Sequence, residues 1–192
     1  MLIGVVSDVH GNAAALRRAI ELMGQLDEWV CLGDSIREFS FSNEVVSLLR
    51  SQPFITLQGN HEEVFFSRAG ERSRSSPGID RDLMRWLGAQ PSRRVLHREG
   101  KEILLVHSTP WPSGGQYVCS HDRDFHRFGE TAADIVLYGH THEPVVARAG
   151  RALVVNPGST GESRLRDERL ELSCAVLDVA AASARIIPFV LD

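Results

Sequence analysis

Residues 1–12 read MLIGVVSDVHGN, and this stretch carries the first signs of both a fold and a functional site. Residues 2–7 form a short nonpolar run rich in β-branched side chains, which predicts a strand. The run leads into two polar residues, Asp8 and His10, and then into Asn12, whose side chain can cap a helix. We therefore expect a strand, a polar turn and a helix in this order.

The same alternation continues through residue 57. The first expected helix carries Leu16, Ile20 and Met23, whose spacing places them on one face. Residues 29–32 and 54–57 predict the next two strands, and Ser42 can cap a second helix between them. Strands that alternate with helices imply βαβ units and a parallel sheet.

The rest of the chain is less regular. Residues 68–78 are polar without nonpolar periodicity and predict a surface loop, which precedes a short helix around residues 83–87. Residues 94–97 and 103–106 flank Glu99-Gly100 and predict a hairpin. A loop at 111–119, a helix within 122–131, and strands at 135–138, 145–147, 153–155, 170–177 and 185–190 complete the expectation. Together these elements predict an α/β sandwich of two sheets packed face to face with helices outside.

The composition predicts one folded domain over residues 1–192. Of the 192 residues, 43% are hydrophobic and 24% are charged, and this nonpolar share excludes general disorder. The formal net charge of -4 argues against an extended nucleic-acid surface. The longest nonpolar runs fall short of the roughly 18 residues that a membrane span needs.

Two further features concern the cellular compartment. The cysteines, Cys31, Cys119 and Cys174, are odd in number and widely spaced, which is typical of reduced thiols in a cytoplasmic protein. Residues 1–8 lack the basic segment and the cleavage site of a signal peptide, so we expect them to be the first strand instead.

Five nonpolar runs lead, within one to three residues, into Asp, Asn or His. The runs are residues 2–6, 29–32, 54–57, 103–106 and 135–138. Ligands of open α/β sheets bind outside the carboxyl ends of the strands, so neighbouring strands would bring these polar side chains to one edge. The residues are Asp8, His10, Asp34, Asn60, His61, His107, His140 and His142.

Local spacing supports this convergence. Asp8 and His10 are separated by one residue, as are His140 and His142, and residues i and i+2 of an extended chain point to the same side. Glycines, which permit tight turns close to a ligand, precede three of the donors. These glycines are Gly33, Gly59 and Gly139.

Each donor alone has an ordinary explanation. Asp8 and Asn60 could cap the helices that follow them, and His107 could be a hydrogen-bonded core or surface histidine that binds no metal. Burying all of these groups at one edge without a cation would incur desolvation and repulsion on the order of several kcal/mol. The set therefore predicts a metal site.

The donor types indicate which ions the site takes. The absence of thiolates from the set argues against a structural zinc site, whereas carboxylate, imidazole and amide ligands suit Mn²⁺, Fe²⁺, Ni²⁺, Co²⁺ or Zn²⁺. Even seven ligands from this set of eight residues are too many for one ion with an open position. Two ions roughly 3.5–4 Å apart that share one carboxylate would use them all.

Six short motifs occur in order between residue 2 and about residue 160. They are Asp8-Val9-His10, Gly33-Asp34, Gly59-Asn60-His61-Glu62, Val106-His107, Gly139-His140-Thr141-His142 and Asn156-Pro157-Gly158-Ser159. The series resembles the calcineurin-like metallophosphoesterases, and it is most similar to their small bacterial and archaeal phosphodiesterases. The resemblance implies a four-layer αββα sandwich of two mixed β-sheets flanked by helices, with the site at one end.

The resemblance also implies a role for each donor. Metal one would be held by Asp8, His10, Asp34 and His142. Metal two would be held by Asp34, Asn60, His107 and His140, with Asp34 bridging the ions. His61 would face the scissile phosphate, where it would protonate the leaving oxygen or stabilise the transition state. The expected catalytic residues are His61, Asp34 and Asn60, of which Asn60 and His61 also contact substrate.

The expected activity is hydrolysis of small phosphodiesters, nucleotides included, by in-line attack of a metal-bridging hydroxide with two divalent ions, Mn²⁺ foremost. Two cations lower the pKa of a shared water toward roughly 7, which makes such a nucleophile available. The expected partner is a small phosphoester substrate and not a membrane, and a homo-oligomer is compatible with the sequence.

Two alternative functions stay open. The first is a phosphomonoesterase, nucleotidase or dinucleoside polyphosphate hydrolase, in which Phe39, Trp111 or Tyr117 would stack on a base. The second is a non-catalytic protein-binding scaffold with the same fold.

The chain departs from the family pattern in two places. Residues 35–39 read SIREF, and Arg37 stands where protein Ser/Thr phosphatases carry an Asp that supports the catalytic histidine, which argues against a protein phosphatase. Arg37 could bind a substrate phosphate or could pair with Glu38 at the surface. Ser108 follows His107 where the family usually has Gly, which bears on the geometry of metal two.

Overall fold

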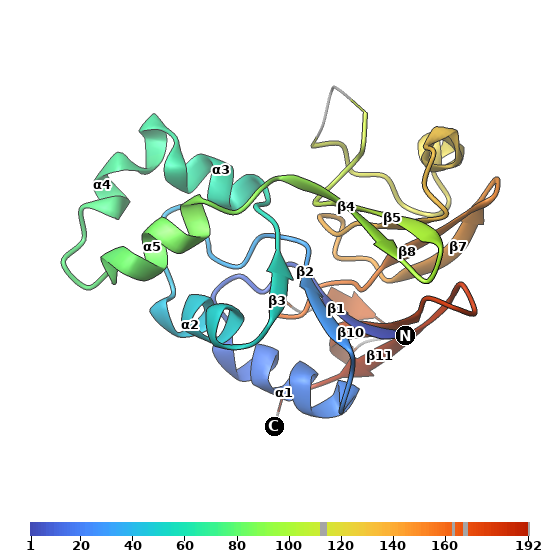
Figure 1. Ribbon diagram of the computed structural model, residues 1–192. Helices are drawn as coiled ribbons and strands as arrows, with labels where there is room; N and C mark the ends of the chain where they lie inside the picture. The colour runs from blue at the N-terminus through green and yellow to red at the C-terminus, as the bar shows by residue number, and fades with distance from the viewer. Residues whose placement is uncertain (112–114, 163, 167–168, 192) are drawn as a thin grey trace.

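The computed structural model describes residues 1–111, 115–162, 164–166 and 169–191. It contains two mixed β-sheets that face each other (Figure 1). The first sheet has the order β11-β10-β1-β2-β3, and β9 pairs with β10. Its strands are β1 (Leu2–Val6), β2 (Glu28–Cys31), β3 (Phe54–Thr56), β9 (Arg164–Arg166), β10 (Arg169–Asp178) and β11 (Ser183–Phe189).

The second sheet has the order β4-β5-β6-β8-β7. Its strands are β4 (Arg93–Arg98), β5 (Lys101–Val106), β6 (Ile135–Leu137), β7 (Val145–Ala149) and β8 (Ala152–Asn156). In both sheets three neighbouring strands run parallel, β1-β2-β3 in the first and β5-β6-β8 in the second. The remaining pairs of neighbouring strands are antiparallel. The Asp, Asn and His residues singled out in the sequence follow the carboxyl ends of these parallel strands, where ligands of such sheets bind.

Helices cover the outer faces of both sheets, so the four-layer αββα sandwich is confirmed. Two α-helices, α1 (Ala13–Met23) and α2 (Asn43–Ser51), pack on the first sheet and lie at the bottom of Figure 1. The second sheet is covered by a 3₁₀-helix, η2 (Arg123–Glu130). A separate nonpolar cluster lies between the sheets and contains Ile3, Val30, Leu105, Leu137 and Val155.

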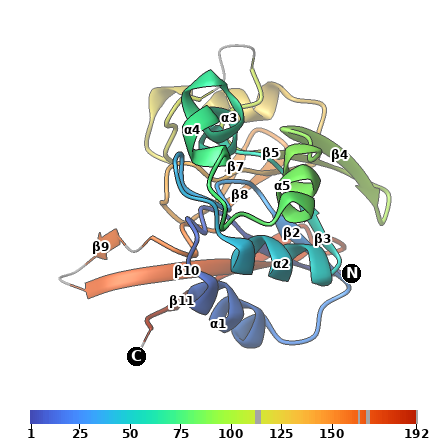
Figure 2. The ribbon, with the colours of Figure 1, turned by 90° about the vertical axis from the view of Figure 1, so that its left-hand side faces the viewer.

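A smaller helical group packs beside α2 and is seen from the front in Figure 2. Its members are α3 (Asn60–Phe66), the 3₁₀-helix η1 (Arg68–Gly70), α4 (Glu71–Arg74) and α5 (Arg81–Gly88). Phe65 of α3 and Leu87 of α5 are fully buried in its core. This group fixes α3, which begins at the edge where the functional residues meet.

The predicted helix caps and hairpin are confirmed. Asn12 accepts a hydrogen bond from the Ala15 N–H at the start of α1, and Ser42 does the same for Val45 at the start of α2. The hairpin between β4 and β5 turns at Glu99 and Gly100, which have φ values of 51° and 73°. Two successive positive φ values are typical of the tight turns that match strand twist.

The prediction of a surface loop at residues 68–78 is wrong for residues 68–74, where η1 and α4 form instead. These turns are short and polar, so they show no nonpolar periodicity that would reveal them in the sequence. The Arg74 guanidinium stabilises them by donating to the carbonyls of Phe65 and Ser67. Residues 112–114 of the loop predicted at 111–119 lie outside the described residues.

Among the described residues, no helix combines the length and the nonpolar character that crossing a bilayer requires.

Candidate metal centre

All eight polar residues singled out from the sequence follow strands at the same end of the two sheets. Asp8 and His10 follow β1, Asp34 follows β2, and Asn60 and His61 begin α3 after β3. His107 follows β5 in the second sheet, and His140 and His142 follow β6. The predicted convergence at one edge is therefore what the structure contains.

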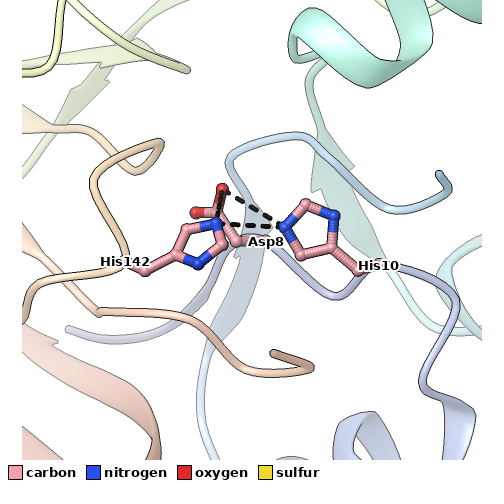
Figure 3. A group of neighbouring side chains, drawn as sticks. All are labelled: Asp8, His10 and His142. Carbon is pink, nitrogen blue, oxygen red and sulfur yellow. Dashed lines mark hydrogen bonds and ion pairs between the residues drawn. The ribbon is translucent and has the colours of Figure 1, made fainter. Parts of the chain in front are cut away.

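The first donor group consists of Asp8, His10 and His142, whose side chains point toward one another (Figure 3). His10 Nε2 and His142 Nε2 are 3.1 Å apart. Asp8 Oδ1 lies 3.3 Å from His142 Nε2 and 3.9 Å from His10 Nε2. Asp8 and His10 are buried and His142 is half-buried, so the three donor atoms face a common point that is partly shielded from bulk water.

The second donor group consists of Asp34, His107 and His140. His107 Nε2 lies 3.3 Å from Asp34 Oδ2 and 3.0 Å from Asn60 Oδ1, which brings the amide into the same group. The His107 Nδ1 atom faces the Leu32 carbonyl at 3.0 Å, a contact that orients the ring.

His61 lies between the two groups. Its Nε2 atom is 3.8 Å from Asp34 Oδ2, and its ring centroid is 4.6 Å from that of His10. His10, Asp34 and His61 form a third set of mutually close donors, so Asp34 borders both of the other groups. The backbone N–H of His61 also donates to Asp34 Oδ1 at 2.9 Å, which fixes that carboxylate relative to α3.

Five of the donors have left-handed backbone conformations. The φ values are 54° for Asp8, 49° for His10, 51° for Asp34, 67° for His140 and 59° for His142. Residues other than glycine rarely adopt such angles, and when they do the strain is often found at functional sites. The turns therefore aim these side chains in directions that relaxed extended backbone would not give.

Two of the glycines noted in the sequence allow close approach at this edge. A Cβ atom at Gly59 would collide with Asp34 Oδ1, and one at Gly139 would collide with the Ser7 hydroxyl and lie 2.7 Å from Asp8 Oδ2. Both positions therefore require glycine because the donors pack directly against the backbone.

Glu62 is a fully buried residue of the third motif, and its role was not predicted from the sequence. Its Oε2 atom accepts the N–H groups of Asp34 and Gly59, both at 2.8 Å. Its Oε1 atom accepts those of Ser35 at 2.7 Å and Ile36 at 3.2 Å. One carboxylate thus ties the turn after β2 to the start of α3. The sequence signal for this role is the position of Glu62 three residues after Gly59 at the start of a helix, where a Glu side chain can accept the N–H of the capping residue.

Burial and charge set the protonation states of the donors. Burial acts to raise the pKa of Asp8, but His142 and His107 outweigh it and lower that pKa to about 2. Burial acts to lower the pKa of His107, but the charge of Asp34 and a hydrogen bond to it raise that pKa to about 9. Burial lowers the pKa of His10 to about 4.

The donor set fits divalent cations. Asp8 Oδ1 is buried without a hydrogen-bond partner in the described part of the chain, and it faces two imidazole nitrogens. Carboxylate oxygens and imidazole nitrogens clustered in this way bind divalent metals such as Mn²⁺ or Zn²⁺. The same cluster without a cation would leave two buried carboxylates compensated only by protonated imidazoles.

Arg37 lies at the rim of the first donor group. Its guanidinium is 3.9 Å from Glu162 Oε1, and Glu162 Oε2 is 3.5 Å from His10 Nε2. The structure thus pairs Arg37 with Glu162 and not with Glu38, the partner considered in the surface alternative. Glu38 Oε1 instead lies 4.0 Å from His61 Nε2.

The three aromatic residues considered as base platforms have different surroundings. Tyr117 is exposed and stacks on His140 with ring centroids 4.0 Å apart. Trp111 packs against Phe128 with ring centroids 5.2 Å apart. Phe39 is exposed. These positions place only Tyr117 in direct contact with a donor residue.

Known proteins share this arrangement of sequence and fold. The family model described as the calcineurin-like phosphoesterase superfamily domain matches residues 1–182. A phosphodiesterase of Methanocaldococcus jannaschii is 23% identical over 82% of this chain and 83% of its own length. The phosphodiesterase YfcE of Escherichia coli K12 is 26% identical over 80% of this chain and 76% of its own length.

A crystal structure of a metallophosphoesterase from Sphaerobacter thermophilus has the same fold. It aligns with a TM-score of 0.78 and 21% identity, over 100% of this chain and 90% of its own. At 21% identity, this structural similarity is evidence for the fold only.

Replacing Glu62 by Gln should destabilise the protein, because an amide has one acceptor oxygen and two of the four N–H groups would face an NH₂ group. We expect the free energy of unfolding to fall by about 2–6 kcal/mol in urea denaturation, since each buried donor left unsatisfied costs about 1–3 kcal/mol. The exposed neighbour gives the matched control, Glu63→Gln, which should stay within about 0.5 kcal/mol of the unmodified protein. Equal stabilities of the two variants would contradict the role of Glu62.

The raised pKa of His107 predicts that metal binding depends on pH. A protonated imidazole cannot bind a metal, so Mn²⁺ binding near pH 7.5 should release about one proton from His107, whose pKa is about 9. The apparent Kd of Mn²⁺ should fall about tenfold per pH unit between about pH 7 and 8.5 and level off near pH 9. Calorimetry in two buffers of different ionisation enthalpy measures the protons released, and an uptake or a count of zero would refute the assignment.

The metal-free protein should respond in the opposite direction. The pKa of His107 is about 9 in the folded state and 6.5 in an unfolded chain, so its stabilising contribution is complete below pH 6.5 and is lost as the pH rises through 9. Urea denaturation in the presence of a chelator should therefore show stability that declines from pH 6.5 to 9. The decline should be smaller in His107→Asn, which cannot titrate.

Proposed function

Because the chain belongs to the calcineurin-like phosphoesterase superfamily and is a metal-dependent phosphoester hydrolase, we propose that it hydrolyses small phosphodiesters with two divalent ions. The observation that carries this proposal is the position of Asp34. Its carboxylate belongs to one donor set with His107 and His140 and to another with His10 and His61. A carboxylate between two sets of imidazoles is suited to bridge two cations.

The proposed ligands follow the two donor groups. Metal one would be held by Asp8, His10, Asp34 and His142, and metal two by Asp34, Asn60, His107 and His140. When bound, the ions supply an activated water and neutralise charge on the phosphoryl oxygens. Mn²⁺ is the proposed ion, because the donors are mixed carboxylate, imidazole and amide groups without thiolates.

His61 is proposed as the residue that serves the leaving group. It lies between the donor groups, and its Nε2 atom is directed toward the Asp34 carboxylate at 3.8 Å. An imidazolium there can protonate a departing alkoxide or stabilise the transition state. The Asn60 amide, 3.0 Å from His107 Nε2, can orient the phosphate as well as ligate metal two.

Arg37 is proposed to bind the phosphate at the rim of metal one. The Arg37 guanidinium reaches Glu162, which in turn reaches His10, so the three side chains form a chain from solvent to the donors. A guanidinium can make two parallel hydrogen bonds to a phosphate, and a phosphate bound at metal one would compete with the Glu162 carboxylate for it.

The preference for diesters is supported by the names of the two relatives, both phosphodiesterases. The scaffold alternative would need the donor set to serve no reaction, and the complete set of seven donors and His61 argues for catalysis.

The test is hydrolysis of bis(p-nitrophenyl) phosphate beside p-nitrophenyl phosphate, with Mn²⁺, Ni²⁺, Co²⁺, Zn²⁺ or Mg²⁺ and with a chelator. We expect turnover that needs metal, is abolished by the chelator and favours the diester. A preference for the monoester would select the phosphomonoesterase, and absence of turnover with every ion would select the scaffold.

Asp34→Asn and His61→Ala should separate metal binding from proton transfer. Asp34→Asn removes the charge proposed to be shared by both ions, so turnover should fall at least about 10³-fold and the bound metal should decrease. His61→Ala should lower kcat by about 10²–10⁴-fold, most for poor leaving groups, and leave the metal content unchanged. Metal analysis of both purified variants measures the difference, and loss of metal from His61→Ala would mean that His61 is a ligand.

Arg37→Ala should lower kcat/KM for a phosphodiester by about tenfold, because a charge-assisted contact to phosphate is lost. The matched variant is Arg17→Ala, since Arg17 also forms an exposed ion pair, with Glu44, but lies on α1 outside the donor groups. A change of less than threefold in Arg37→Ala would remove Arg37 from the substrate site.

A further inference from the structure

A pocket of about 520 Å³ opens beside the second donor group. Asn60 and His107 form the wall that the pocket shares with the proposed metal site. The start of α3, the start of β4 and the segment after β5 form the remaining walls. The lining residues that matter for ligand chemistry are Glu63, Ser92, Arg93, Val106, Pro110 and Trp111.

This volume exceeds the space that a single phosphate group needs. The pocket is therefore large enough for an organic group attached to a phosphate held at the donor residues. The sequence motifs do not include Ser92, Arg93, Pro110 or Trp111, so these residues distinguish this chain's pocket from the general metal site.

Arg93 is placed in this pocket by its register in the second sheet. It is the first residue of β4, and it pairs with Val106 across the antiparallel ladder. Paired residues carry their side chains on the same face of a sheet, and His107 is the next residue after Val106. The ladder thus places Arg93 opposite Val106, the residue that precedes the proposed metal ligand His107.

The Arg93 guanidinium has most of its hydrogen-bonding capacity free. Within the described residues it makes one hydrogen bond, from Nη1 to the Pro110 carbonyl at 3.2 Å, and no ion pair with a carboxylate. An arginine carries five N–H donors in a fixed planar arrangement that matches phosphate and carboxylate oxygens. This side chain is therefore available to bind an anion in the pocket.

The nonpolar part of the pocket is held in place by neighbouring contacts. Trp111 packs against Phe128, the Arg127 guanidinium lies 4.3 Å from its ring centroid, and its Nε1 atom donates to Gln116 Oε1 at 2.6 Å. Val106 and Pro110 add further nonpolar surface. A fixed nonpolar wall, in a pocket lined also by two proposed metal ligands and by an arginine, suits a carbon body with an anion at each end.

We propose that this pocket binds the organic part of the substrate and that Arg93 binds a second anionic group on it, so that the substrate class is a phosphoester that also carries a phosphate or carboxylate. The inference rests on the proposed function, because the first phosphate is taken to lie at the donor groups. Glu63 is the one carboxylate among the described lining residues, and it opposes the binding of the second anion by repulsion.

The test compares ligands that differ only in the second anion. Propylphosphonate carries one anionic group, and propane-1,3-diphosphonate and 4-phosphonobutyrate add a phosphonate or a carboxylate at the end of a three-carbon chain. Their Kd values for the Mn²⁺-loaded protein are measured by calorimetry, and their inhibition constants are measured against bis(p-nitrophenyl) phosphate. We expect at least one doubly anionic ligand to bind about tenfold or more tightly than propylphosphonate.

Arg93→Ala should remove that preference and leave the Kd of propylphosphonate unchanged. Arg94→Ala is the matched control, since it removes the same charge from the next residue of β4, whose side chain lies on the opposite face. Glu63→Gln should tighten only the doubly anionic ligands. If Arg93→Ala fails to fold, Arg93→Gln replaces it, and circular dichroism checks the fold of each variant.

Each outcome has a definite meaning. Equal binding of all three ligands, a preference retained in Arg93→Ala, or an equal loss in Arg94→Ala would overturn the inference. The stronger of the two doubly anionic ligands identifies phosphate or carboxylate as the second group. A preference that depends on Arg93 in a protein without turnover would support the pocket and refute only the proposed hydrolysis.

Discussion

Two buried carboxylates, Asp8 and Asp34, lie at the ends of adjacent parallel strands, and the structure of this edge depends on compensating their charge. Each is almost inaccessible to solvent, at 0% and 2% exposure. Ionised groups in such surroundings need partners of opposite charge, because water is not available to solvate them. The imidazoles of His107 and His142 partly meet this need through their contacts with the carboxylates, and bound divalent cations would meet it more fully.

The sandwich brings the partners together from both sheets. Strands β1 and β2 supply the carboxylates, whereas β5 and β6 of the opposite sheet supply His107, His140 and His142. The nonpolar layer between the sheets therefore fixes the separation of donors from distant parts of the chain. Glu62 adds a local constraint, because its four backbone hydrogen bonds hold the Asp34 turn against α3.

The strands and the convergence of the polar residues at one edge could be predicted from the sequence because both follow local rules: nonpolar runs form strands, and polar residues follow their carboxyl ends. The one-turn helix at Glu71–Arg74 could not, because its stability comes from Arg74 contacts with carbonyls and not from a nonpolar face. Two further features could not be predicted from the sequence: the pairing of Arg37 with Glu162, and the hydrogen bonds of Glu62 to the turn after β2. Both join segments whose proximity is created only when the strands assemble.

The left-handed backbone of the donors has an evolutionary consequence. An unfavourable conformation at a non-glycine residue stores roughly 1 kcal/mol or more, so five such positions withhold a sizeable part of the stability that the fold could attain. A descendant freed from selection for catalysis would gain stability by acquiring glycine or asparagine at these turns. Among homologues, glycine or asparagine at the positions of His10 and His142 would therefore identify proteins that keep the sandwich fold but have lost its catalytic activity.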